Sequence, residues 1–301
     1  MSLQELEEVR SILREMDLAL AGPVDVARTN FEEMLSHSPL DESIAFEETS
    51  VGGIPALRSV APGASDERVM LYLHGGAFLI GSAHGYRAFF SGLARDAGAT
   101  GLAIDYRLAP EHPFPAAVDD ALAAYRGLLD EGRAPGQIVV AGDSAGGGLA
   151  ASLLVAARDA GLPMPAGALL LSPWADLRCD TPSMEGKADE DLSLTPGDLR
   201  ASAERYLNGA DPANALASPV LADLTGLPPL LITVGSCEIL LDDAVALAGR
   251  AGECGVRATL DVWPQMPHVW QSFAFMLSEG AEASADASRW LAQRLDEEAD
   301  R

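Results

Sequence analysis

Short apolar runs alternate with longer amphipathic segments over most of the chain. The runs with the length and apolarity of buried strands are Val69–Leu73, Gly101–Asp105, Ile138–Ala141, Ala168–Leu171, Leu230–Val234 and Ala258–Trp263. Segments with apolar residues at helical spacing lie between or after most of them, at about 84–97, 115–130, 145–160, 240–253 and 283–298. Because alternating strands and helices build a sheet covered on both faces, we expect an α/β protein with a mostly parallel sheet.

The N-terminal part of the chain has the pattern of two amphipathic helices. Apolar residues recur at helical spacing over residues 3–16, and Ser2 with Glu5 fits a capping box at the start. A Gly-Pro pair ends this segment, and a second amphipathic segment follows it. Since its apolar face needs a surface to cover, we expect residues 1–42 to lie over the main domain.

A strand pattern replaces the helical one near residue 43. Ile44–Thr49 and Ile54–Ser59 are separated by a short link that contains Gly52-Gly53. Two glycines between strand-like segments are typical of a tight hairpin turn, so a β-hairpin is predicted here.

The interval between the fourth and fifth apolar runs is too long for a simple crossover helix. It holds a well-signalled helix start, with Thr195 as N-cap, Pro196 in the first turn and Asp198 at N3. We interpret residues 178–215 as an insertion that joins the N-terminal helices in a cap; the alternative is a disordered surface loop. The predicted domains are N-terminal cap helices (1–42), an α/β domain (43–177 and 216–301) and a cap insertion (178–215).

Charge and composition narrow the classes of partner. The 301 residues include 45 Asp and Glu against 20 Lys and Arg, which gives a formal net charge of −25. Such a surface repels phosphate backbones and anionic headgroups, so we expect no nucleic-acid and no membrane partner. The chain has no run of 18 apolar residues, and its acidic start lacks the apolar stretch of a secretory signal, which favours a cytoplasmic protein.

Cysteine usage argues against a metal or disulfide framework. Cys179, Cys237 and Cys254 are few and lack paired spacing, so we expect no metal and no other cofactor. The last strand, Ala258–Trp263, is expected at an edge of the sheet, where a second copy could pair; a homodimer is therefore considered.

Residues 142–146 (Gly-Asp-Ser-Ala-Gly) match the G-x-S-x-G nucleophile elbow. They directly follow the strand Ile138–Ala141 and open a helical segment, which is the setting that the elbow requires. Small residues are needed two before and two after the serine because the turn is too tight for side chains there. Ser144 is therefore the candidate nucleophile; the alternative is a glycine-rich turn without catalysis.

Residues 74–78 (His-Gly-Gly-Ala-Phe) end the strand Val69–Leu73 and suit an oxyanion hole. An acyl-transfer enzyme needs backbone N–H donors where the carbonyl oxygen becomes negative, and glycines allow the close approach. We expect the amides of Gly75 and Gly76 to serve, with that of Ala145 just after the serine. The alternative is an ordinary turn at the end of a strand.

His268 is the candidate general base. It alone of the five histidines follows Ser144, as the order serine, acid, histidine of α/β-hydrolases requires, and it lies just after the last strand. The candidate acid is Glu238, at the exit of the preceding strand, with Asp242 as the alternative. Asp242 and Asp243 stand near the next helix start, where acidic residues favour the helix dipole and are expected to face solvent.

With these residues assembled, the chain resembles the hormone-sensitive-lipase-like esterases, specifically the bacterial members with a GDSAGG elbow. The matching stretches are His74–Ala77, Asp105–Ala116, Gly142–Gly147, Ser172–Leu177, Ser218-Pro219 and Gly226–Pro229. The resemblance implies the α/β-hydrolase fold with an eight-stranded sheet, a helical cap, hydrolysis of short-chain acyl esters, and the roles given above to Ser144 and His268. It also implies Gly75, Gly76 and Ala145 as oxyanion donors. One departure is Glu238, which stands where the family usually has aspartate.

The predicted function is that of a serine carboxylesterase that cleaves short-chain acyl esters through an acyl-enzyme intermediate. One alternative keeps the same triad but cleaves amide or peptide bonds. Another is a non-catalytic receptor that binds a small apolar ligand under the cap.

Overall fold

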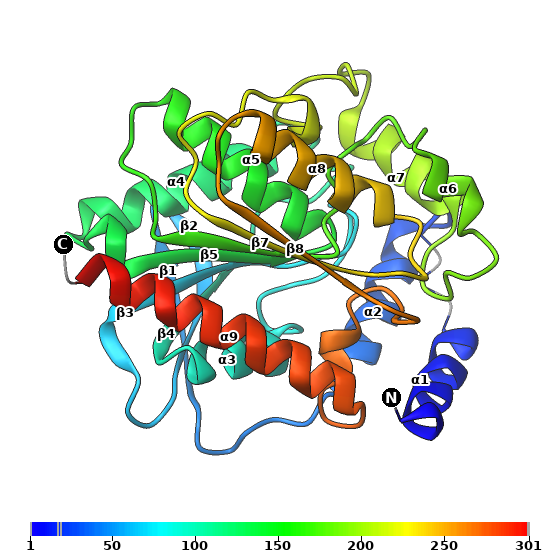
Figure 1. Ribbon diagram of the computed structural model, residues 1–301, viewed down its shortest axis with the longest axis horizontal. Helices are drawn as coiled ribbons and strands as arrows, with labels where there is room; N and C mark the ends of the chain where they lie inside the picture. The colour runs from blue at the N-terminus through cyan, green and yellow to red at the C-terminus, as the bar shows by residue number, and fades with distance from the viewer. Residues whose placement is uncertain (1, 17, 19, 300–301) are drawn as a thin grey trace.

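A mostly parallel sheet forms the centre of the computed structural model, which describes residues 2–16, 18 and 20–299. Within these residues the sheet has eight strands in the order β1-β2-β4-β3-β5-β6-β7-β8 (Figure 1). The strands are β1 (Ala45–Val51), β2 (Ile54–Val60), β3 (Ser65–Leu73), β4 (Ala99–Ile104), β5 (Ile138–Asp143), β6 (Gly167–Leu171), β7 (Leu230–Gly235) and β8 (Ala258–Trp263). Strand β2 pairs antiparallel with β1 and β4, and the other neighbours pair in parallel. The predicted fold class is confirmed.

Helices cover both faces of this sheet, as the alternating pattern predicts. Helices α3 (Arg87–Asp96) and α9 (Ser278–Ala299) lie on one face, and α4 (Ala116–Asp130), α5 (Ala145–Asp159) and α8 (Leu241–Glu253) lie on the other (Figure 1). Every residue of β4, β5, β6 and β7 is buried, which explains why these strands are apolar throughout rather than alternating. Three 3₁₀ turns of the described chain are η1 (Pro135–Gln137), η2 (Pro219–Leu221) and η3 (Trp270–Phe273).

The predicted hairpin is confirmed at β1 and β2. Val51 pairs with Ile54, and the two residues between them, Gly52 and Gly53, have φ of 58° and 82°. Both values lie in the left-handed region that glycine adopts without strain, and a positive φ at both central residues is the requirement of a type I′ turn.

The N-terminal helices are α1 (Leu3–Glu15) and α2 (Val24–Ser36). Leu6, Val9 and Leu13 of α1 pack in one apolar cluster with Met266 and Trp270, which flank the loop of His268. Helix α1 therefore rests against a segment from the far end of the chain that carries a candidate catalytic residue.

The start of α1 is capped differently from the predicted capping box. Ser2 Oγ accepts the N–H of Glu5 as expected, at 3.4 Å. The carboxylate of Glu5, however, accepts the N–H of Ser278 at 2.8 Å, and the N–H of Ser2 donates to Glu279 at 3.0 Å. Helices α1 and α9 thus exchange their capping carboxylates, which holds the two N-termini together.

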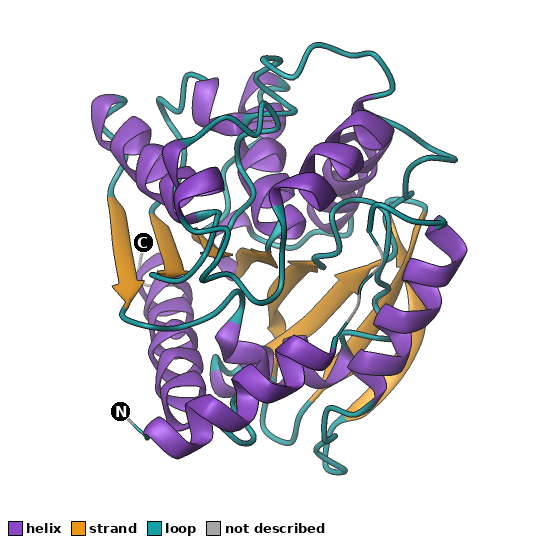
Figure 2. Ribbon diagram, turned by 90° about the vertical axis from the view of Figure 1, so that its right-hand side faces the viewer, coloured by secondary structure: helices purple, strands orange, loops and turns teal. Residues whose placement is uncertain are grey.

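The segment predicted as an insertion contains α6 (Pro182–Gly186) and α7 (Pro196–Leu207). Thr195 caps α7, with its Oγ1 accepting the N–H of Asp198 at 3.1 Å, as predicted. Arg205 of α7 donates to the carbonyl groups of Leu20 and Ala21, so α7 contacts the link between α1 and α2. Figure 2 views the end of the sheet at which these helices gather. The boundaries of the three predicted domains stay a prediction.

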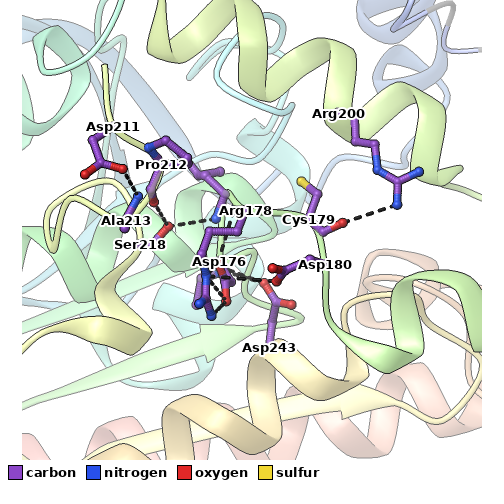
Figure 3. A network of polar contacts seen from close by, with 12 residues as sticks. Asp176, Arg178, Cys179, Asp180, Arg200, Asp211, Pro212, Ala213, Ser218 and Asp243 are labelled. Atoms are coloured by element: carbon purple, nitrogen blue, oxygen red, sulfur yellow. Dashed lines mark hydrogen bonds and ion pairs between the residues drawn. The ribbon is translucent and has the colours of Figure 1, made fainter. Parts of the chain in front are cut away.

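Both ends of this segment are held by buried polar contacts (Figure 3). Asp243 of α8 accepts the N–H groups of Ala175 and Asp176, each at 2.9 Å. Ser218 Oγ accepts the N–H of Leu177 at 2.8 Å and donates to the carbonyl of Pro212 at 2.7 Å. The segment therefore leaves and rejoins the sheet at fixed points.

The prediction that Asp242 and Asp243 face solvent is wrong. Asp243 is 0% exposed, and burial raises the pKa of its carboxyl well above the usual value. Asp242 is partly buried, and its carboxylate accepts the N–H of Ser183 in α6 at 2.7 Å. Both acids begin α8, but tertiary contacts to the segment after β6 decide their orientation. None of the helices formed by the described residues is long and apolar enough to cross a membrane.

Candidate active site

Ser144 stands at the sharp turn between β5 and α5. Its φ of 52° and ψ of −123° are strained for a residue with a side chain. Hydrogen bonds on both sides hold this conformation: its N–H donates to Leu171 at 2.8 Å, and its carbonyl accepts the N–H groups of Gly148 at 3.1 Å and Trp174 at 2.9 Å. The sequence-predicted elbow is thus present in the structure.

The two glycines that flank the serine have no room for a side chain. A Cβ on Gly142 would lie 2.3 Å from the carbonyl oxygen of Gly146, and one on Gly146 would lie 2.0 Å from that of Leu73. Both distances are far inside van der Waals contact with backbone atoms. The spacing of small residues in the motif therefore follows from the approach of α5 to the end of β3.

Glu238 and His268 form a close pair on the loops that follow β7 and β8. Glu238 Oε2 lies 2.6 Å from Nδ1 of His268. The other oxygen, Oε1, accepts the hydroxyl of Ser172 at 2.7 Å and the N–H of Gly235, and the side chain is 0% exposed. Asp242, the alternative acid, bonds to α6 instead. A carboxylate at Nδ1 fixes the proton on that nitrogen and leaves Nε2 free to accept one.

The surroundings of His268 favour its protonated form. Burial alone would lower the pKa of the imidazole, but the charge and hydrogen bond of Glu238 outweigh it, with contributions from Asp191 and Asp143. The pKa of His268 is therefore raised above its usual value. Burial raises the pKa of Glu238 as well, and the contact with His268 opposes that rise.

A mainly apolar pocket brings Ser144 and His268 together with the loop after β3. Its walls come from the N-terminal segment, the segment before and within α3, the insertion and the loop of His268. The apolar wall residues include Leu13, Met16, Leu18, Leu20, Phe31, Met34, Leu35, Phe89, Leu194 and Leu199. The helices predicted to form a cap thus supply much of the wall.

The prediction that Gly75 is an oxyanion donor is wrong. Its N–H donates to Asp143 Oδ1 at 2.9 Å, so this amide is already used inside the protein. Gly76 and Ala77 line the pocket instead. Among the residues that the structure describes, the amides of Gly76, Ala77 and Ala145 donate to no acceptor. Gly76 and Ala77 lie in the pocket of Ser144, and Ala145 directly follows the serine, so these three amides are the candidate oxyanion donors; Ala77 is the one that the sequence reasoning missed.

Asp143 is a second residue that the sequence reasoning missed. Its buried carboxylate accepts the hydroxyl of Tyr72 at 2.6 Å, the hydroxyl of Tyr86 at 2.9 Å and the N–H of Gly75. An acidic residue beside the nucleophile that must be satisfied by buried donors was a usable signal for this role. Asp143 ties the oxyanion loop to the elbow.

His74 has a structural role in the oxyanion loop. Its Nδ1 lies 2.7 Å from the carbonyl of Gly75, and its ring stacks on Tyr106 at 4.3 Å. The hydroxyl of Tyr106 donates to the carbonyl of His74 at 2.7 Å. Tyr106 therefore supports the oxyanion loop through His74. In the described part of the chain, no cluster of three or more His, Cys, Asp or Glu is arranged to hold a metal ion.

Taken together, the sheet, the elbow and the acid–histidine pair on successive strands define an α/β-hydrolase. A family model described as an alpha/beta hydrolase fold matches residues 70–272. The chain is 51% identical over 232 residues to an acetyl-hydrolase of Streptomyces hygroscopicus, covering 77% of this chain and 78% of the relative. It is 33% identical over 279 residues to a carboxylesterase of Mycobacterium tuberculosis, covering 88% and 87%.

A solved structure agrees over almost the whole chain. The crystal structure of an esterase from the bacterial hormone-sensitive lipase family matches with a TM-score of 0.94 and 47% identity, covering 98% of this chain and 99% of that one. The chain therefore belongs to the alpha/beta hydrolase family, within its bacterial hormone-sensitive lipase group, and it is a carboxylic ester hydrolase. The resemblance read from the sequence is confirmed.

Proposed function

We propose that the protein is a serine carboxylesterase that cleaves short-chain acyl esters through an acyl-enzyme intermediate. The observation that carries this proposal is the 2.6 Å contact between Glu238 and Nδ1 of His268, on a ring that shares its pocket with Ser144. This arrangement supplies a nucleophile, a base with a fixed tautomer, and a group that stabilises the imidazolium.

The proposed reaction has two halves that use the same groups. Nε2 of His268 takes the proton of Ser144 as its oxygen attacks the ester carbonyl, and the imidazolium then protonates the leaving alcohol. Water, deprotonated by the same nitrogen, attacks the acyl-enzyme; the bond to the serine oxygen breaks, the imidazolium returns its proton to that oxygen, and the acid is released. The amides of Gly76, Ala77 and Ala145 receive the oxyanion in both steps; the loss of one such donor typically costs about 10²–10³ in kcat.

The pocket and the relatives support small, uncharged acyl groups. The wall is mainly apolar, so it accepts the hydrocarbon part of an ester and disfavours a charged one. The net charge of −25 acts in the same direction against anionic substrates. A relative with 51% identity is named for acetyl hydrolysis.

The experiment is a p-nitrophenyl ester series from acetate to decanoate, without added metal, on wild type and on Ser144→Ala. Turnover should be greatest on short chains, and the variant should be inactive while its circular dichroism stays that of wild type. Matched p-nitroanilides should be cleaved far more slowly, which separates an esterase from an amidase. A folded Ser144→Ala variant with turnover near wild type would rule the mechanism out.

Three expectations about the setting of the protein stay predictions from the sequence. They are the cytoplasmic location, the absence of nucleic-acid and membrane partners, and the homodimer. The structure places β8 at the end of the strand order, so the edge on which the dimer prediction rests is present.

A further inference from the structure

The buried carboxylate of Asp191, in the insertion, hydrogen-bonds both to a wall of the active-site pocket and to the loop of Glu238. Asp191 lies between α6 and α7 and is 7% exposed. Its Oδ1 accepts the N–H groups of Ser193 at 2.9 Å and Leu194 at 3.0 Å. Its Oδ2 accepts the N–H of Ile239 at 2.9 Å. One side chain thus binds two separate segments of backbone.

Both of these segments belong to the site. Ser193 and Leu194 line the pocket that holds Ser144. Ile239 directly follows Glu238, the residue that contacts the imidazole. A shift of the Asp191 carboxylate would therefore move a pocket wall and the loop of the acid together.

Burial raises the pKa of Asp191, while the nearby imidazole of His268 and the three N–H donors oppose that rise, because they favour the charged form of the carboxyl. Glu238 and Asp143 are acidic as well and, like Asp191, raise the pKa of His268. Arg10 of α1 donates to the carbonyl of Gln265, in the loop that carries His268.

We propose that Asp191 is a positioning residue of the esterase site: by binding Ile239 and the Ser193–Leu194 turn at once, it fixes the acid loop against the pocket wall. The inference rests on the proposed function, because it assigns Asp191 to the reaction of Ser144. Its charge has a second effect, since an anion near the imidazole stabilises the imidazolium.

The test compares Asp191→Asn with Glu190→Gln. The first change removes a buried charge and at least one of the three hydrogen bonds, while keeping the side-chain size. The second removes the same charge from the neighbouring residue, which is exposed and pairs with Lys187. The ring pKa of His268 is measured by NMR titration, assigned with His268→Gln, and kcat and KM are measured on p-nitrophenyl butyrate across pH.

Asp191→Asn should lower kcat by about tenfold or more, because misplacement of a catalytic group by about 1 Å can cost 10²-fold. KM should change less. The pKa of His268 should fall, so that the acidic limb of the pH profile moves to lower pH, whereas Glu190→Gln should leave both unchanged. Wild-type kcat together with a wild-type His268 titration in Asp191→Asn would overturn the proposal, and so would an equal shift in Glu190→Gln.

If Asp191→Asn does not fold, Asp191→Glu replaces it. This variant keeps the charge on a longer side chain, so kcat should fall while the pKa of His268 stays near that of wild type; an unchanged kcat would overturn the proposal. The NMR titration needs no turnover. An inactive wild type would therefore refute the proposed function, while the titration would still decide whether Asp191 acts on His268.

Discussion

The backbone N–H of Gly75 donates to the carboxylate of Asp143 at 2.9 Å, which joins the oxyanion loop to the residue just before the nucleophile. This contact turns Gly75 away from the substrate and leaves Gly76 and Ala77 facing the pocket. The two loops that must act on the same carbonyl group are therefore held by one buried side chain, to which Tyr72 and Tyr86 also donate.

Asp143→Ala should be costly for both stability and activity. It leaves the amide of Gly75 and two tyrosine hydroxyls without their acceptor, and an unsatisfied buried donor costs about 1–3 kcal/mol. We expect the free energy of unfolding to fall by about 3 kcal/mol and kcat to fall more than KM changes, measured by urea denaturation and ester turnover. Asp189→Ala, an exposed acid outside the pocket, is the control. A wild-type kcat in Asp143→Ala would contradict this role, because it would show that the oxyanion loop keeps its conformation without the Asp143 carboxylate.

The tight approach at the elbow predicts that one methyl group has opposite effects at two glycines. In Gly146→Ala the new Cβ would lie 2.0 Å from the carbonyl oxygen of Leu73, so little folded, active protein is expected. In Gly249→Ala, on the exposed side of α8, the new Cβ would have no described atom within 4 Å apart from the backbone of its own helix and its chain neighbours. There a helix former replaces glycine and should stabilise the protein by about 0.5–1 kcal/mol. Thermal unfolding and esterase activity measure both; an active, stable Gly146→Ala would contradict the geometry.

The acid assignment predicts different effects for two neighbouring carboxylates. Glu238→Ala removes the partner of Nδ1 and should lower kcat by about 10³–10⁴, as for the acid of other triads. Asp242→Ala removes a hydrogen bond to Ser183 in α6 and should leave kcat within a few-fold of wild type. The measurement is kcat for both folded variants on p-nitrophenyl butyrate. The reverse order of effects would make Asp242 the acid.

The raised pKa of His268 predicts the pH at which activity is lost. The base must be neutral to accept the proton of Ser144, so kcat/KM should fall as pH drops through its pKa. Because Glu238, with Asp191 and Asp143, outweighs the burial that would lower it, the pKa of His268 is raised, and the half-point of the acidic limb should lie above the 6.5 of an ordinary imidazole. In Glu238→Gln, the half-point of the acidic limb of the residual activity should lie at lower pH than in wild type, because the negative charge beside the imidazole is removed. A half-point well below 6.5 in wild type would contradict the electrostatics described above.

Much of the fold could be predicted because the signals are local. Fully buried strands such as β5 read as unbroken apolar runs, and Gly52-Gly53 marks the hairpin. The ends of elements were mispredicted where the terminal residues are polar. Strand β3 begins at Ser65, before the predicted Val69, because its first residues are not buried and so show no apolar run. Helix α9 likewise begins at Ser278, before the predicted start at 283, because its first residues are polar or small and carry no apolar periodicity.

Candidate site residues could be predicted where one motif or their order along the chain assigns them, as for Ser144, Glu238 and His268. They could not be predicted where a contact with a residue distant in sequence sets the role. Nothing near Gly75 indicates that its amide is taken by Asp143. Nothing near Asp243 indicates that a helix-start acid will be buried against Ala175 and Asp176.

Ser144 is proposed to carry the acyl group, and mass spectrometry can detect that group on the protein. Wild type is mixed with p-nitrophenyl butyrate, quenched in acid within the first turnover, and digested to locate any adduct. We expect a gain of one butyryl group on the peptide that contains Ser144, and no gain in Ser144→Ala. Continued turnover by folded Ser144→Ala, or an adduct on a different residue, would contradict it.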